Sequence, residues 1–141
     1  YDNPSLNTRF WTGKNPTRVF IDKHLSVPQN FHVFDGSQSS ICYNLIENND
    51  SDNVSFVKIP HLDTIEPFII QDLYERKIQS LVIEGGTFLL QRFIDLHLFD
   101  EAIVLKSKRL LGRGIAAPAI NQTDATIENL GDNWLIKLKK S

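Results

Sequence analysis

A pair of glycines lies where an apolar run meets a helical pattern, in the segment Ile83-Glu84-Gly85-Gly86-Thr87. Glycine has no Cβ, so a bulky anion can approach the backbone closely, and a helix N-terminus adds about half a positive charge. In open α/β sheets, ligands also bind beyond the carboxyl ends of the strands. The pattern predicts a phosphate-binding turn. The alternative is a simple tight turn in which Thr87 caps the helix, because one glycine pair is less specific than a full dinucleotide-binding motif.

Glu84 stands between this glycine pair and an apolar run that ends at Ile83. A carboxylate is costly to bury in an apolar core. We therefore expect Glu84 to face a cleft, where it accepts hydrogen bonds from a sugar or heterocycle or helps to move a proton. The alternative role is a hydrogen bond to the backbone of the following turn.

A second group of polar side chains occupies segment 2–9, whose sequence is DNPSLNTR. It combines an acid, a rigid turn, an apolar residue and a guanidinium. Arg9 is able to bind a phosphate through two parallel N–H groups. The alternative is that Arg9 is a surface arginine in a polar loop.

Composition excludes several classes of function. The chain has 141 residues and is 41% hydrophobic, which fits one compact domain. Its formal charge is −2, so it lacks the strong positive field that drives general binding to nucleic acids or anionic membranes. Cys42 is the single cysteine, and the four histidines are scattered, so we predict no disulfide and no metal site. No apolar run approaches the roughly 20 residues of a membrane helix, and the start does not resemble a signal peptide. We expect a cytoplasmic protein.

The first half of the chain should supply strands and one helix. Apolar and β-branched runs predict strands at 18–22, 41–46 and 54–59, with 47–53 as a surface loop. After them the period changes, and the spacing of apolar residues predicts an amphipathic helix over 65–77.

The second half should contain a strand-helix-strand unit and a hairpin. A strand is expected at 80–83, a helix from Thr87, and a further strand at 102–105. This order normally builds a parallel pair through a right-handed crossover. Alternating residues at 126–128 and 134–139 flank a Gly131-Asp132-Asn133 turn and predict an antiparallel hairpin.

Several blocks, taken in order, make the chain similar to a known family. They are 2–9, Arg18–Asp22 with Leu25 and Pro28, Leu81–Gly86, Phe99–Glu101, and Leu111-Gly112. Together they resemble the reductase domain of the bifunctional deaminase-reductase of riboflavin biosynthesis, and the resemblance covers nearly the whole chain.

The resemblance implies an α/β, dihydrofolate-reductase-like fold: a mixed, mostly parallel sheet flanked by helices, with a C-terminal antiparallel hairpin. It implies NADPH-dependent reduction of 5-amino-6-(5-phosphoribosylamino)uracil at the ribosyl C1′. It further implies that the protein forms a homodimer and that the full-length chain carries an N-terminal zinc deaminase domain.

The family's site residues transfer to several positions of this chain. Asp2 would lie beside NADPH, Leu6 and Arg9 would contact the substrate, and Glu84 would contact the substrate and take part in catalysis. Lys23 would meet the 2′-phosphate of the cofactor. The cofactor would also follow a continuous segment made of Gly85, Gly86, Thr87, Phe88, Leu89, Leu90, Gln91 and Arg92.

The chain departs from the family pattern in three respects. Asn3 replaces the second of two acids, and Lys23 stands where a small hydroxyl residue is common. The family's domain begins upstream with a strand and a helix that supply cofactor contacts. We therefore expect residues 1–141 to be the later part of one reductase domain, a loop at 1–16 followed by an α/β core at 17–141, and poorly active alone. The alternatives are a related reductase of a pterin or a diaminopyrimidine, and a non-catalytic nucleotide-binding remnant.

Overall fold

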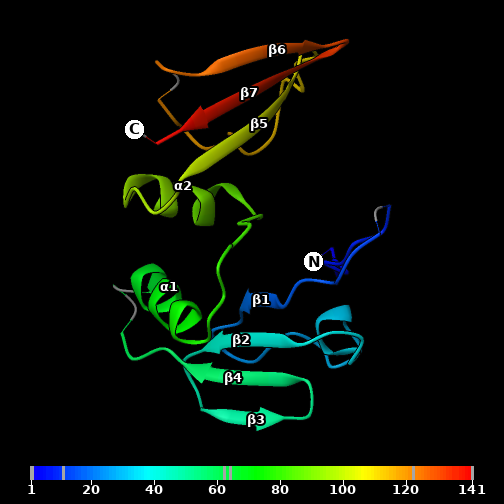
Figure 1. The fold of residues 1–141 in the computed structure, drawn as a ribbon, viewed down its shortest axis with the longest axis vertical. Helices are drawn as coiled ribbons and strands as arrows, with labels where there is room; N and C mark the ends of the chain where they lie inside the picture. Colours follow the sequence, from blue (N-terminus) through cyan, green and yellow to red (C-terminus); the bar gives the residue numbers. More distant parts are fainter. Residues whose placement is uncertain (1, 11, 62, 64, 122, 141) are drawn as a thin grey trace. The chain divides into compact units, whose positions relative to one another are not determined.

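The computed structural model describes residues 2–10, 12–61, 63, 65–121 and 123–140. The chain divides into two compact units, Tyr1–Lys77 and Ile78–Ser141. Each unit has its own sheet (Figure 1).

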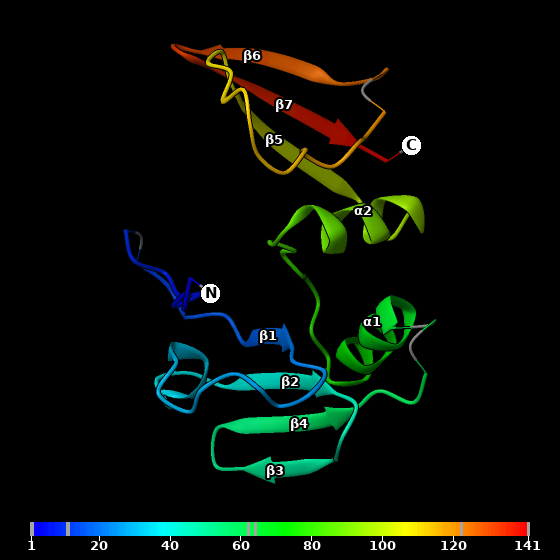
Figure 2. The same ribbon diagram turned by 180° about the vertical axis from the view of Figure 1, so that it is seen from behind.

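The first unit is built on a four-stranded sheet in the order β1-β2-β4-β3 (Figure 2). Its strands are β1 (Arg18–Ile21), β2 (Ser40–Asn44), β3 (Asn49–Ser51) and β4 (Val54–Lys58). β1 pairs in parallel with β2, and β2 pairs in parallel with β4. β3 and β4 form an antiparallel hairpin. The sheet is therefore mixed and mostly parallel, as predicted.

Helix α1 (Ile65–Glu75) packs on one face of this sheet. The Tyr43 ring meets Phe68 edge to face with centroids 6.3 Å apart, and its hydroxyl donates a hydrogen bond to Asp72 at 2.7 Å. Burial raises the pKa of Tyr43, and its bond to Asp72 adds to that effect. The amphipathic pattern of the sequence thus places the apolar side of α1 against β2.

The opposite face of the sheet is covered by the long connection between β1 and β2. This connection contains a short 3₁₀ helix, η1 (His32–Phe34). Phe34 meets Phe20 edge to face at 5.6 Å and stacks on Phe56 at 6.4 Å. Phe20 and Phe56 both lie opposite Cys42 in the register of the sheet. Burial on this face raises the pKa of the Cys42 thiol to about 12, so the thiol is protonated and unreactive.

Leu73 is a core residue of α1, only 2% exposed. We expect Leu73→Ala to lower the free energy of unfolding by about 2–5 kcal/mol, because it removes buried methyl groups and leaves a cavity. Its neighbour Tyr74 is 68% exposed, so Tyr74→Ala is the matched control and should change stability by about 0.5 kcal/mol or less. Urea-dependent hydrogen exchange of the β2 amides in the full-length protein measures both effects. Equal losses in the two variants would contradict the packing described.

The second unit combines one helix with a three-stranded antiparallel sheet in the order β5-β7-β6. Its elements are α2 (Thr87–Asp95), β5 (Glu101–Ser107), β6 (Thr126–Leu130) and β7 (Asn133–Lys139). Phe93 of α2 is buried, as are Ile136 and Leu138 of β7. The predicted hairpin is confirmed, and its turn contains Gly131 at a φ of 61°.

The predicted strand at 80–83 is wrong, since residues 78–86 are in neither helix nor strand. The predicted parallel pair through a crossover is wrong with it, because β5 instead pairs with β7 in antiparallel register. A short apolar run shows that a segment can be extended, but a strand also needs a partner edge. The structure therefore contains two sheets, one mixed and one antiparallel.

Smaller differences occur at the other element boundaries. The predicted loop at 47–53 contains β3, whose three residues are all exposed. An edge strand of this kind can be polar because it buries neither face. α1 ends at Glu75 rather than at Lys77, and β2 ends at Asn44 rather than at Ile46. Within the described residues, no helix is long and apolar enough to cross a membrane.

Candidate functional site

The turn before α2 has an open backbone, as the glycine pair predicts. Gly85 adopts a φ of 150°, which residues with a side chain rarely adopt. Gly86 is the N-cap of α2 in extended conformation, with no side-chain hydrogen bond to the cap, and a Cβ added to it would meet no atom within 4 Å. The first N–H groups of a helix have no partner within the helix. This turn is therefore able to receive an anion.

Two side chains of the predicted cofactor segment attach a distant loop to α2. The Thr87 hydroxyl donates to the carbonyl oxygen of Ala116, so Thr87 does not cap the helix. The Gln91 amide donates to the Ala119 carbonyl at 3.2 Å and accepts from the Ala119 N–H at 2.8 Å. These contacts occupy the side chains of Thr87 and Gln91 and leave the N-terminus of α2 without a side-chain cap.

The other members of the predicted segment differ in exposure. Phe88 is 74% exposed. Leu89, Leu90 and Arg92 are half-buried. Glu84 is exposed, and no hydrogen bond or ion pair to its carboxylate is found within the described part of the chain. The alternative role of Glu84, a bond to the following turn, is not observed, and its carboxylate is available to a ligand.

The predicted substrate loop at 2–9 belongs to the first unit and has an unusual backbone. Asn3 and Leu6 have φ values of 43° and 46°, each a conformation that costs a non-glycine residue about 1–3 kcal/mol. Three hydrogen bonds donated by residues outside the loop hold its first part. They are His32 N–H to Asn3 Oδ1 at 2.7 Å, Arg18 Nε to the Ser5 carbonyl at 2.8 Å, and Gln38 Nε2 to the Leu6 carbonyl at 2.8 Å.

Arg18 is the most deeply buried member of this arrangement, with a side chain 1% exposed. Its guanidinium binds Asp35 through two bonds of 2.7 and 3.3 Å and also donates to the Ser37 hydroxyl at 3.2 Å. Hydrogen bonds from Arg18, and then from Ser37, hold the pKa of the Asp35 carboxyl well below its usual range. The pair is ionised across the physiological pH range.

Two cations of the predicted site lie on the surface of the first unit. Arg9 and Lys23 are exposed, and neither makes an ion pair with any described residue. Asp2 is exposed at the start of the same loop as Arg9. Arg9 therefore has a guanidinium free to bind a phosphate.

Lys23 lies at the carboxyl edge of the parallel strands, and its backbone is held on both sides. Its carbonyl accepts from Leu45 N–H at 3.0 Å. The preceding Asp22 is buried and accepts from Val27 N–H at 2.8 Å and from the Ser26 hydroxyl at 3.0 Å. Burial alone would raise the pKa of Asp22, but these hydrogen bonds lower it below the ordinary value.

The predicted site residues are thus distributed over three places. Asp2, Leu6 and Arg9 share one loop, which Arg18 holds at the amino end of β1. Lys23 follows the carboxyl end of the same strand. Glu84 and the residues that follow it up to Arg92 belong to the second unit.

Three residues that hold the loop at 2–9 in place, directly or through a partner, were not predicted from the sequence: Arg18, Asp35 and Gln38. A signal was present, because a charged residue that opens an otherwise apolar strand must find a partner when it is buried. The identity of that partner was not readable, since Asp35 lies 17 positions away in a segment without periodicity.

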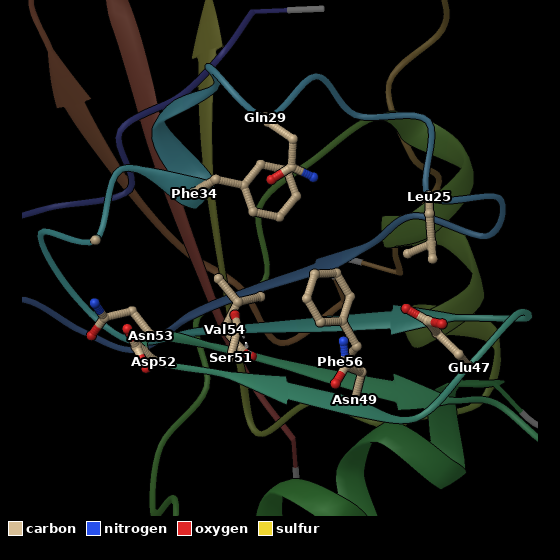
Figure 3. A pocket seen from close by; sticks show the side chains of 11 residues that line it. Leu25, Gln29, Phe34, Glu47, Asn49, Ser51, Asp52, Asn53, Val54 and Phe56 are labelled. Carbon is tan, nitrogen blue, oxygen red and sulfur yellow. Dashed lines mark hydrogen bonds between the residues drawn. The ribbon is translucent and has the colours of Figure 1, made fainter.

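A pocket of about 480 Å³ lies on the face of the first sheet opposite α1 (Figure 3). Phe34 and Phe56 both line it, and its lining also includes the polar side chains of Gln29, Glu47 and Asn49. None of the predicted site residues lines this pocket. Among the described residues, no group of three His, Cys, Asp or Glu side chains could hold a metal ion.

Comparison with protein families gives one match that spans almost the whole chain, the RibD C-terminal domain, over residues 1–139. The riboflavin biosynthesis protein RibD of Aquifex aeolicus is 26% identical over 99% of this chain and 43% of its own length. The 2,5-diamino-6-ribosylamino-4(3H)-pyrimidinone 5′-phosphate reductase of the same organism is 27% identical over 79% of this chain and 53% of its own length. The chain thus spans about half the length, or less, of these curated relatives.

Solved structures show the same fold. The diaminohydroxyphosphoribosylaminopyrimidine deaminase/5-amino-6-(5-phosphoribosylamino)uracil reductase of Thermotoga maritima matches with a TM-score of 0.82 at 24% identity, over 99% of this chain and 42% of that one. The riboflavin biosynthesis reductase Rib7 of Saccharomyces cerevisiae matches with a TM-score of 0.70 at 16% identity, over 89% and 69%. The fold predicted from the sequence resemblance is therefore confirmed.

Proposed function

Because this chain belongs to the RibD C-terminal domain family, we propose that it is the reductase part of a riboflavin-biosynthesis protein, which reduces 5-amino-6-(5-phosphoribosylamino)uracil to the ribitylamino product with NADPH. The family match over residues 1–139 carries this proposal. The open turn before α2 and the free guanidinium of Arg9 support it, since both ligands contain phosphate.

The residues before and within α2 fit a dinucleotide. The first N–H groups of the helix, beginning at Thr87, would bind the diphosphate, and the open space at Gly86 leaves room for it. The ammonium of Lys23 would meet the 2′-phosphate that distinguishes NADPH from NADH. When bound, the nicotinamide supplies the hydride. Asp2 is proposed to lie on the cofactor side of its loop.

Three residues are proposed to handle the substrate. Arg9 binds the sugar phosphate through its guanidinium, and Leu6 provides an apolar contact. Glu84 recognises the sugar and manages the proton that must reach the developing amine or alcohol when C1′ is reduced. The exposed, unpaired carboxylate of Glu84 suits this role, because no other described group competes for it.

A related substrate is the second candidate. The Aquifex aeolicus relative named as a 2,5-diamino-6-ribosylamino-4(3H)-pyrimidinone 5′-phosphate reductase matches 79% of this chain at 27% identity. The two pyrimidines share the ribose 5-phosphate and differ in the ring, so Arg9 serves either one equally. Discrimination must then come from groups that contact the heterocycle.

We propose the following context for the full-length protein. Residues 1–141 form the later part of one reductase domain, and a zinc deaminase domain precedes it, as the two activities in the name of the Thermotoga maritima protein suggest. The protein acts in the cytoplasm as a homodimer. Ile103 and Leu105 of β5, which are 66% and 69% exposed, offer apolar surface for such a dimer.

The proposed activity is tested directly with purified full-length protein. We expect NADPH oxidation that depends on 5-amino-6-(5-phosphoribosylamino)uracil and yields the ribitylamino product by mass spectrometry. The diaminopyrimidine analogue is the comparison substrate, and a higher kcat/KM for it would favour the second candidate. Saturable NADPH binding without turnover of either pyrimidine would contradict both and leave a nucleotide-binding remnant.

A further inference from the structure

We infer that Gln38 and Arg18 are positioning residues, which hold the loop at 3–9 ready for the phosphorylated substrate by binding the carbonyl oxygens of Leu6 and Ser5. This inference rests on the proposed function, because it assumes that the loop contacts the substrate. Neither residue touches the ligand in this scheme. They act through the backbone conformation of the loop.

Gln38 is better suited to hold the loop than to stabilise the fold. Its Nε2 donates to the Leu6 carbonyl at 2.8 Å, whereas its Oε1 is buried with no hydrogen-bond partner among the described residues. Leaving a buried amide oxygen unpaired costs stability. A side chain of the same shape without polar atoms would avoid that cost, so the contact with Leu6 is the feature that requires glutamine here.

Arg18 supplies the rigid base of the arrangement. Asp35 and Ser37 accept hydrogen bonds from the two terminal nitrogens of its guanidinium. Because the guanidinium is planar and rigid, these bonds also fix the direction in which Nε donates to the Ser5 carbonyl. A lysine cannot reproduce this geometry, because its ammonium is a point charge on a flexible stem. Because the Arg18 side chain is buried and fixed, its hydrogen bond holds the Ser5 carbonyl in one position.

The far side of the loop is also tied. Asn15 Oδ1 accepts from both the N–H and the hydroxyl of Thr8, at 3.1 and 2.9 Å. The loop is thus bonded at Ser5, at Leu6 and at Thr8, which directly precedes Arg9. The Arg9 side chain itself has no ion-pair partner in the described chain. A loop ordered in advance loses less conformational entropy when a ligand binds.

Gln38→Met in the full-length protein tests the inference. We expect the KM for 5-amino-6-(5-phosphoribosylamino)uracil to rise about tenfold, with kcat, the KM for NADPH and the melting temperature nearly unchanged. The matched control is Gln71→Met, because Gln71 is exposed on α1 and its amide donates, among the described residues, to Glu75 alone, at 2.8 Å. This control should leave every parameter unchanged. Arg18→Lys should raise the same KM, with a lower melting temperature.

Hydrogen exchange provides a readout that does not require turnover. We expect two amides to exchange faster in Gln38→Met than in Gln71→Met: that of Thr8, which donates from the loop to Asn15, and that of His32, which donates to Asn3 of the loop. Unchanged exchange, or an unchanged substrate KM in an active enzyme, would overturn the inference. So would a fall in melting temperature and kcat without a change in KM, which is the signature of a purely structural residue. A wild-type protein inactive on the uracil substrate would overturn the proposed function, while exchange would still decide whether Gln38 orders the loop.

Discussion

Glu84→Gln in the full-length protein is expected to lower kcat/KM for pyrimidine reduction by about 100- to 1,000-fold, which is the range that a positioned acid or base contributes. The amide keeps the shape and the hydrogen-bonding capacity of the side chain but cannot take up or release a proton at neutral pH. The carboxylate of Glu84 is exposed and makes no ion pair with a described residue, so the change should disturb no internal contact.

The dissociation constant for NADPH distinguishes a loss of proton transfer by Glu84 from a disturbed backbone in the turn that follows it. We expect it to stay within about twofold of wild type in Glu84→Gln, because the backbone of Gly85 and Gly86 is unchanged. Glu47→Gln is a suitable control, since Glu47 is another exposed carboxylate but belongs to the first unit. If kcat/KM for Glu84→Gln equalled that of Glu47→Gln, Glu84 would have no part in the mechanism.

Arg9→Ala is expected to raise the KM for the phosphorylated substrate by about 100-fold. Charge-assisted hydrogen bonds are worth about 1.5–3 kcal/mol each, so losing a phosphate contact with two of them gives about this factor after partial replacement by water. The KM of Arg9→Lys should lie between those of the wild type and Arg9→Ala, because lysine keeps the positive charge but lacks the two parallel N–H donors of the guanidinium.

The phosphate itself supplies the sharpest control for Arg9. With the dephosphorylated nucleoside analogue as substrate, wild type and Arg9→Ala should have similar kcat/KM, since the group that Arg9 binds is then absent. Arg109→Ala serves as the control variant, because Arg109 is also exposed and makes no ion pair with a described residue. A 100-fold loss that persisted on the nucleoside would show that Arg9 acts on something other than the phosphate.

The parts of the structure predicted from the sequence depend on residues close together in the chain. Gly85 and Gly86 directly precede the start of α2 at Thr87, as predicted, because helix initiation is decided by the neighbouring residues. The hairpin of β6 and β7 has its alternating pattern and its glycine turn within one short stretch. α1 follows from apolar residues spaced at helical intervals.

Contacts between distant residues could not be predicted in the same way. The residues at 80–83 are apolar enough for a strand, but whether such a segment pairs depends on which edges the folded chain offers, and β5 pairs with β7 instead. The hydrogen bond from Gln38 to Leu6 in the loop at 3–9 is also a contact between distant residues, since the two lie 32 positions apart. No local pattern marks a hydrogen bond over that separation.

The sequence by itself therefore determined the family, the helical segments and the C-terminal hairpin, and it singled out Arg9 and Glu84 as candidates for the site. Only the tertiary structure decided which strands pair, that Thr87 and Gln91 bind a distant loop, and that Arg18 and Gln38 bind the loop at 3–9. The physical reason is the range of the forces involved. Propensity, capping and periodicity act over a few neighbouring residues, whereas hydrogen bonds and packing across the fold form only between groups that the completed chain brings together.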